Sequence, residues 1–336
     1  MSALTLGLLS ALLATNQPQA VSNVIQQQTG VSVKLAAGPA EQELREVMMS
    51  DDAALDEVNQ WIHEFDALPA TNQTKEASAA LNKRIIERFG VVRKAYENFL
   101  RKHPDSAHGF LAYGSFLNDI GDEEGAKVQY ENSRQLDPKN PAVWNNLANY
   151  YGEFSPVTNA FAYYAEAIKL DPTEPVYYQN FATTVYLFRK DAREYYHINE
   201  QQVFDKALAL YRQAMKLDPS NLVLATDYAS SYYGIKPMRT NDALAAWTNA
   251  LEVAHNDLER EGVLIHLART KIAAGMYDEA QATLNTITNA ALADLRRRLE
   301  RSLRDHKNPP PEDEPEIPAH PAATTNVPPV MNGQKP

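Results

Sequence analysis

Apolar residues recur at three- and four-residue steps over most of this chain. Near its beginning, two series show these steps: Leu55, Val58, Ile62 and Phe65, then Leu81, Ile85 and Phe89. Such steps follow the 3.6-residue period of a helix that has one apolar face. The pattern therefore predicts amphipathic helices from about Glu41 onward, packed on elements further along the chain.

A longer period accompanies the helical one. Pro104, Pro138 and Pro172 are each 34 residues apart, within the similar strings RKHPDS, RQLDPKN and IKLDPTE. A fourth string, MKLDPSN, places Pro219 at a distance of 47, which is one period plus an insertion of 13 residues. A fixed period of this size indicates stacked helical units, each packed only on its neighbours.

Each unit interleaves small and large residues at fixed positions. In the clearest unit these positions hold Trp144, Leu147, Ala148 and Tyr151, then Ala160, Tyr164, Ala167 and Pro172. Small side chains let two helices approach closely, while the aromatic rings fill the space beside them. Asn140 and Pro141 supply a helix cap and a proline in the first turn. The pattern predicts two antiparallel helices per unit.

This order of residues at a period of 34 resembles the tetratricopeptide repeat, and the resemblance covers about residues 74–304. It implies an all-α fold, a right-handed superhelical solenoid of antiparallel helix pairs within a repeat domain over residues 41–305. The expected repeats lie near residues 73–106, 107–140, 141–174, 175–221, 222–257 and 261–290, with a capping helix over 291–305. Since the residues that define this family pack the solenoid, they do not indicate a ligand.

The two ends of the chain have a different character. Leu4 to Ala14 is an apolar run of signal-peptide length, with no Lys or Arg before it, and fits either an export leader or a packed helix. With a linker it makes up residues 1–40, and it leaves localisation open: exported or periplasmic if it is a leader, cytoplasmic otherwise. Nine of the 28 residues from Pro309 onward are Pro, which predicts a disordered tail over residues 306–336.

Composition narrows the function classes. The 336 residues carry a net charge of -11 and no cysteine. An acidic chain is a poor match for phosphate backbones, so we expect no nucleic-acid partner. Without Cys there is no disulfide, thiolate nucleophile or Cys-ligated metal. This apolar run of eleven residues is too short to span a bilayer, and we expect no transmembrane span.

The sequence contains none of the common nucleotide-binding, hydrolase or zinc-protease motifs. Glu194 with His197 and Glu252 with His255 both read E-x-x-H, the spacing of helical di-iron sites, which leaves a metal-dependent helical enzyme as an alternative. We expect instead no catalysis, metal or cofactor, since such short patterns are common in helical chains. Tyr195 and Tyr196 in the insertion either meet a partner or, as we favour, fold onto a neighbouring helix.

A partner-binding groove is predicted on the first helices, at positions that the packing pattern does not use. These positions hold amides, hydroxyls and Tyr rings: Asn145, Asn149, Gln179, Thr183, Tyr186, Thr226 and Tyr233. Such groups suit an extended peptide or a helix of another protein. Some members of the resembled family bind chaperone C-termini through cationic residues, but Gln179 and Thr183 stand at the corresponding positions. The sequence predicts a non-catalytic interaction scaffold, with an architectural subunit of an envelope or secretion assembly as a further alternative.

Overall fold

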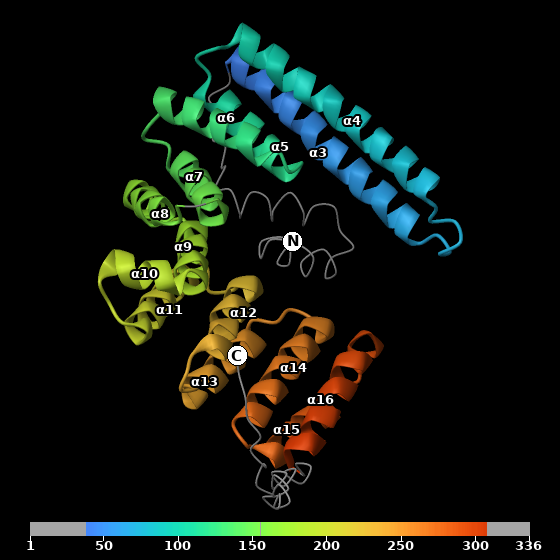
Figure 1. Ribbon diagram of the computed structural model, residues 1–336, viewed down its shortest axis with the longest axis vertical. Helices are drawn as coiled ribbons and strands as arrows, with labels where there is room; N and C mark the ends of the chain where they lie inside the picture. The colour runs from blue at the N-terminus through green and yellow to red at the C-terminus, as the bar shows by residue number, and fades with distance from the viewer. Residues whose placement is uncertain (1–37, 155, 308–336) are drawn as a thin grey trace, which may run out of the picture. The chain divides into compact units, whose positions relative to one another are not determined.

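The computed structural model describes residues 38–154 and 156–307, and these residues form fourteen α-helices, two short 3-10 helices and no strand (Figure 1). The predicted all-α class is confirmed. The leader and the Pro-rich tail lie outside the described residues. In chain order the helices are α3 (Pro39–Asp66), α4 (Lys75–Lys102), α5 (Ala107–Asp119), α6 (Glu123–Leu136), α7 (Pro141–Glu153), α8 (Thr158–Leu170), α9 (Pro175–Leu187), α10 (Arg189–Tyr196), α11 (Glu200–Leu217), α12 (Leu222–Ser231), η1 (Tyr232–Gly234), α13 (Thr240–Glu252), α14 (Asp257–Ala273), α15 (Tyr277–Asn285), η2 (Ala290–Leu292) and α16 (Ala293–Lys307).

The chain divides into two compact units, one up to Val263 and one from Leu264. In the first unit, α5 pairs with α6, α7 with α8, α9 with α11, and α12 with α13. The second helix of a pair also packs on the first helix of the next one: α6 on α7, α8 on α9, and α11 on α12. This order of contacts is that of a solenoid, in which each repeat, here a pair of helices, touches only the neighbouring repeats.

Helix ends fall where the sequence provides caps. Asn140 accepts a hydrogen bond from the backbone N–H of Ala142, and Pro141 begins α7, as predicted. Ser106 and Asn221 cap α5 and α12 in the same way. The turn after α5 passes through Gly121 at a φ of 79°, a conformation that glycine adopts without strain.

Small residues allow close contact within the pairs. Ala148 on α7 and Ala160 on α8 are both fully buried, and the ring of Tyr164 lies in the same cluster. On α5, a Cβ at Gly114 would come within 2.6 Å of the Tyr130 ring, so only glycine fits there without a shift. The predicted core role of these pattern positions is confirmed.

The helices α3 and α4 are longer than the others, at 28 residues each, and pack on each other as a hairpin. Arg88 on α4 forms an ion pair with Glu57 on α3, with Nε and Oε2 2.9 Å apart. The guanidinium of Arg84 lies 3.7 Å from the ring centre of Trp61. These contacts hold the part of the hairpin that extends beyond α5.

The 13-residue insertion forms α10 and lengthens the start of α11. The rings of Tyr195 and Tyr196 lie 5.3 and 5.7 Å from the ring of Phe161 on α8. The ammonium of Lys206 on α11 lies 4.2 Å from the ring of Tyr196. The interpretation that these aromatics fold onto a neighbouring helix is therefore confirmed, although Tyr195 keeps 42% of its surface exposed.

The second unit contains most of α14, with α15, η2 and α16. Leu284 and Ile287 are buried there, with Leu299 of α16 packed against them. Lys271 donates to the hydroxyl of Thr283, and Lys307 pairs with Asp278. Within residues 38–154 and 156–307, no helix is both long and apolar enough to cross a membrane.

Candidate partner-binding site

Seven residues are predicted to meet a partner, and we call them the candidate stripe. They are distributed over the first helices of three consecutive repeats. Asn145 and Asn149 lie on α7, three members on α9, Thr226 on α12 and Tyr233 on η1. Their exposure and hydrogen bonds decide which of them a partner could touch.

Asn145 is completely buried, and the expectation that it faces a partner is wrong. Asn180 of α9 donates from Nδ2 to Oδ1 of Asn145 at 3.1 Å. Asn145 in turn donates to Oδ1 of Asn146 at 3.3 Å. This side chain links α7 to α9, and the amide pairing satisfies groups that would otherwise be costly to bury.

Asn149 and Thr183 are half-buried, and both bind tyrosines of second helices. The hydroxyl of Tyr164 on α8 donates to Oδ1 of Asn149 at 2.7 Å. The hydroxyl of Tyr211 on α11 lies 2.7 Å from that of Thr183. The expectation that stripe residues take no part in packing is therefore wrong here, because the pattern tyrosines reach across the helix pair with their polar ends.

Gln179 connects α9 to α12. Its Nε2 donates to Oδ2 of Asp227 at 2.8 Å. Burial raises the pKa of the Asp227 carboxyl to about 6, and the hydrogen bond from Gln179 opposes that rise. The surface between these two helices therefore carries an amide and a carboxyl that are joined to each other, with both residues half-buried.

Tyr186, Thr226 and Tyr233 retain exposed surface. The ring of Tyr186 packs on Phe204 at 5.9 Å, and burial raises the pKa of its hydroxyl. Thr226 donates its hydroxyl to the backbone carbonyl of Val223, inside its own helix. The ring of Tyr233 lies 5.8 Å from that of Trp247. All three residues are half-buried: the fold orients them and leaves part of each side chain open to solvent.

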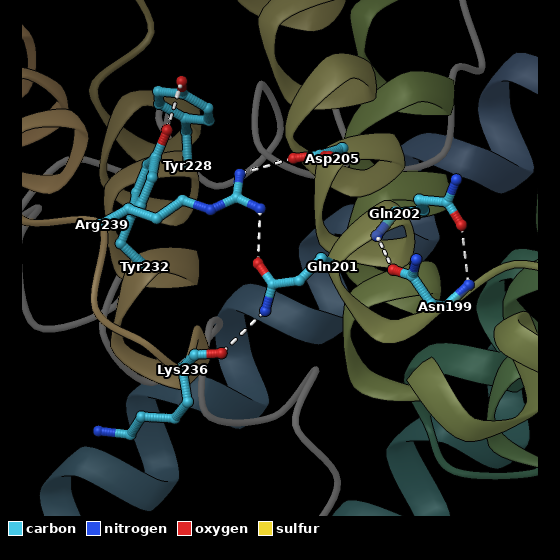
Figure 2. A network of polar contacts seen from close by, with 8 residues as sticks. All are labelled: Asn199, Gln201, Gln202, Asp205, Tyr228, Tyr232, Lys236 and Arg239. Atoms are coloured by element: carbon cyan, nitrogen blue, oxygen red, sulfur yellow. Dashed lines mark hydrogen bonds and ion pairs between the residues drawn. The ribbon is translucent and has the colours of Figure 1, made fainter.

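A polar network fixes the loop that follows Tyr233 (Figure 2). Arg239 donates to Asp205 at 2.6 Å and to Gln201 at 2.8 Å, both on α11. Gln201 donates to the backbone carbonyl of Lys236 at 2.8 Å. Two anchors on α11 thus hold the segment between η1 and α13, which supports the position of Tyr233.

One position further along each of these first helices lies a polar residue that the predicted stripe does not include. Asn146, Asn180 and Asp227 are 34 and 47 residues apart, the same steps as the prolines. Two of them bind the stripe residue of the preceding unit, through the pairs of Asn145 with Asn180 and Gln179 with Asp227. Recurrence of polar residues in otherwise apolar helices was the available signal.

Asn146 departs from this rule. It is 3% exposed, and its Nδ2 is buried without a hydrogen-bond partner. The residue one repeat before Asn145 is Leu111, whose side chain cannot accept a hydrogen bond. Because Leu111 of the preceding repeat offers no acceptor, the Nδ2 group of Asn146 stays without a hydrogen bond.

Three carboxyls lie where α3 packs against α5. Asp51 is 8% exposed, and its Oδ2 accepts a hydrogen bond from Tyr96 at 2.9 Å. Asp52 follows on the same helix, and Asp119 is the last residue of α5. Burial raises the pKa of Asp51 to about 7, and Asp119 and Asp52 raise it further by their charge. Nothing in the periodicity indicated this cluster.

The two E-x-x-H pairs do not converge on one centre. His255 binds Glu259 through Nδ1 at 3.2 Å, and His197 ends α10 in a left-handed conformation. Within the part of the chain that the structure describes, no group of three acidic or His side chains is arranged to hold a metal ion.

Comparison with known proteins finds similarity among solved structures only. No family model and no curated protein matches the chain. The TPR protein TTC0263 of Thermus thermophilus is 20% identical over 59% of this chain and 100% of that one, with a TM-score of 0.42. The C-terminal part of a TPR protein of Cytophaga hutchinsonii is 14% identical over 76% and 98%, with a TM-score of 0.49. YrrB, a TPR protein with an unusual peptide-binding site, is 13% identical over 64% and 99%, with a TM-score of 0.46.

The sequence identities and TM-scores are low, so the repeat assignment rests on features of this chain itself. Its 34-residue spacing, its helix pairs and its buried pattern residues are those of tetratricopeptide repeats.

Proposed function

We propose that this chain is a non-catalytic scaffold that binds an extended segment of another protein along its first helices. The observation that carries the proposal is that some residues of the candidate stripe hold helices together, whereas others keep surface that a partner can contact. Asn145, Asn149 and Thr183 set the spacing of the helices through hydrogen bonds. Tyr186 and Thr226 are half-buried beside them, and the hydroxyl of Thr226 binds within its own helix, so part of each side chain stays open to a partner.

The half-buried tyrosines and Gln179 suit a peptide by their chemistry. Tyr rings offer flat apolar contact with a polar end, and they lose little conformational entropy because packing has already oriented them. Gln179 carries an amide oxygen that can accept from a backbone N–H while its nitrogen binds Asp227. A row of such groups recognises main chain in an extended conformation.

Thr226→Arg tests the proposal against a matched control, Thr248→Arg. Both threonines donate to a backbone carbonyl of their own helix, Thr226 on α12 and Thr248 on the second helix α13. Phage-displayed random dodecapeptides selected on the unmodified protein provide the probe. We expect Thr226→Arg to weaken the selected peptides by at least about tenfold, roughly 1.4 kcal/mol.

Thr248→Arg should leave peptide binding within about twofold, and both variants should keep their helicity and melting temperature, as expected for substitutions away from the core. Equal binding by the two variants, or a selection that yields no peptide, would count against a site on the first helices.

A further inference from the structure

The acidic cluster of Asp51, Asp52 and Asp119 is incomplete as it stands. Oδ1 of Asp51 is buried and has no hydrogen-bond partner, while Oδ2 is bound by the hydroxyl of Tyr96. Asp52 and Asp119 lie next to it, one on α3 and one at the end of α5. Both residues keep solvent-exposed surface, but surrounding atoms partly enclose their carboxyl groups and raise the pKa of each. A buried carboxylate oxygen without a donor is costly, and so is crowding of like charges.

No cation of the described residues pairs with these three carboxyls. Basic residues toward the end of α4 and at its C-cap have other partners: Arg93 binds Asp122, and Lys102 and His103 both bind Glu43. The remaining groups that act on the cluster are Tyr96 of α4, Asp56 of α3, and Asn118 with Asp119 on α5. None of these supplies a positive charge.

The cluster lies at the same end of the first helices as the half-buried Tyr186. Asn118 precedes Tyr186 by 68 residues, which is two periods, so the two occupy equivalent positions in their helices. Asp119 is the next residue. A segment that lies across the candidate stripe can therefore extend to α5 and α3, within the same compact unit.

We propose that Asp51, Asp52 and Asp119 receive the side chain of a Lys or Arg from the protein segment that binds the candidate stripe. The proposal rests on the proposed function and names the chemistry of one end of the ligand. Charge complementarity identifies the occupant: three carboxyls without a counter-charge attract a cation, and a guanidinium or ammonium donates several hydrogen bonds at once. A long flexible stem can deliver that group, whereas a metal ion needs an arrangement of ligands that these residues lack.

Binding should depend on pH in a defined direction. Burial raises the pKa of both Asp51 and Asp119 to about 7, and it also raises the pKa of Asp52. A bound cation favours the ionised carboxyls and so releases protons. Affinity should therefore increase as the pH rises from about 5.5 to about 8.

The test uses two fluorescein-labelled, amidated peptides, alternating Ala with Lys or Ala with Glu, and measures anisotropy on the full chain. Two double variants are compared. The cluster variant combines Asp52→Asn and Asp119→Asn, and the control variant combines Asp66→Asn and Asp305→Asn. The control pair is exposed and changes the net charge equally; Asp66 lies at the far end of α3 from the cluster's place on that helix, and Asp305 lies on α16. We expect the Lys peptide to bind the unmodified protein about tenfold or more tightly than the cluster variant, and the control to stay within about twofold.

Several outcomes would overturn the inference. Equal loss in both double variants would mean attraction by overall charge, and no binding of the Lys peptide, or equal binding of the Glu peptide, would remove the cationic anchor. Calcium that binds by calorimetry only when the cluster is intact, without peptide binding, would make an ion the occupant. If selected dodecapeptides respond to Thr226→Arg but not to the cluster variant, the scaffold function stands and only the anchor is refuted.

Discussion

Replacing Asp51 by Asn removes a buried charge without changing the shape of the side chain. The Asn oxygen can still accept the hydroxyl of Tyr96, which now binds Oδ2 of Asp51 at 2.9 Å. The Asn amide takes the place of the unpartnered Oδ1, so a donor replaces a charged acceptor in the neighbourhood of Asp52 and Asp119. The substitution therefore isolates the cost of ionising this group.

The size of the effect follows from the pKa of Asp51, which burial raises from 3.8 to about 7. This rise corresponds to roughly 4 kcal/mol, at about 1.4 kcal/mol per pH unit. Because the folded state holds its proton more tightly than the unfolded state, the group costs stability as the pH rises from about 4 to about 7. Roughly 4 kcal/mol is an upper limit, since local rearrangement and water entry reduce the cost of a buried charge.

Urea denaturation followed by circular dichroism at 222 nm measures this difference. We expect Asp51→Asn to be more stable than the unmodified chain by about 2 to 4 kcal/mol near pH 8.5, and the difference to shrink below about 1 kcal/mol near pH 4.5. The matched control is Asp66→Asn at the exposed end of α3. A stability difference that is the same at both pH values, or Asp51→Asn less stable at pH 8.5, would refute the reasoning.

Two further substitutions test the packing. Ala148→Arg should lower the free energy of unfolding by about 3 kcal/mol or more, because the side chain is fully buried between α7 and α8; urea denaturation checks this, and full stability would contradict the assigned face. Gly234→Ala should lower the melting temperature, since its Cβ would lie 2.1 Å from the Tyr186 hydroxyl, at a cost of about 1 to 3 kcal/mol. Adding Tyr186→Phe should restore much of that loss, and failure of this rescue would place the strain elsewhere.

The sequence was sufficient for the helix pairs because their packing constrains residue size at fixed steps. Ala148, Ala160 and Tyr164 are buried as the 34-residue pattern predicts. The length of α3 and α4 was not predictable in the same way. Amphipathic spacing identifies a helix face, whereas the ends of this hairpin depend on local capping, such as Thr74 accepting from the N–H of Ala77.

The candidate stripe was only partly predictable, and the reason lies in side-chain length. Helical spacing gives the direction of Cβ for Asn149 and Thr183, but it does not tell what reaches them from another helix. Here Tyr164 and Tyr211 do so with their hydroxyls. A tyrosine at a core position carries a polar group to the far side of its ring, so its partner lies outside the apolar pattern.

The insertion leaves the order of the stripe residues along the first helices unchanged. The 13 extra residues form α10 and lengthen the second-helix side, where α10 packs on α8, α9 and α11. On the first-helix side, Gln179 still binds Asp227, although 48 residues separate them instead of the 35 between Asn145 and Asn180. Because the same polar link forms with and without the insertion, α7, α9 and α12 present their stripe residues in unbroken order. An extended segment bound there would meet equivalent positions in successive units, and the insertion would not interrupt it.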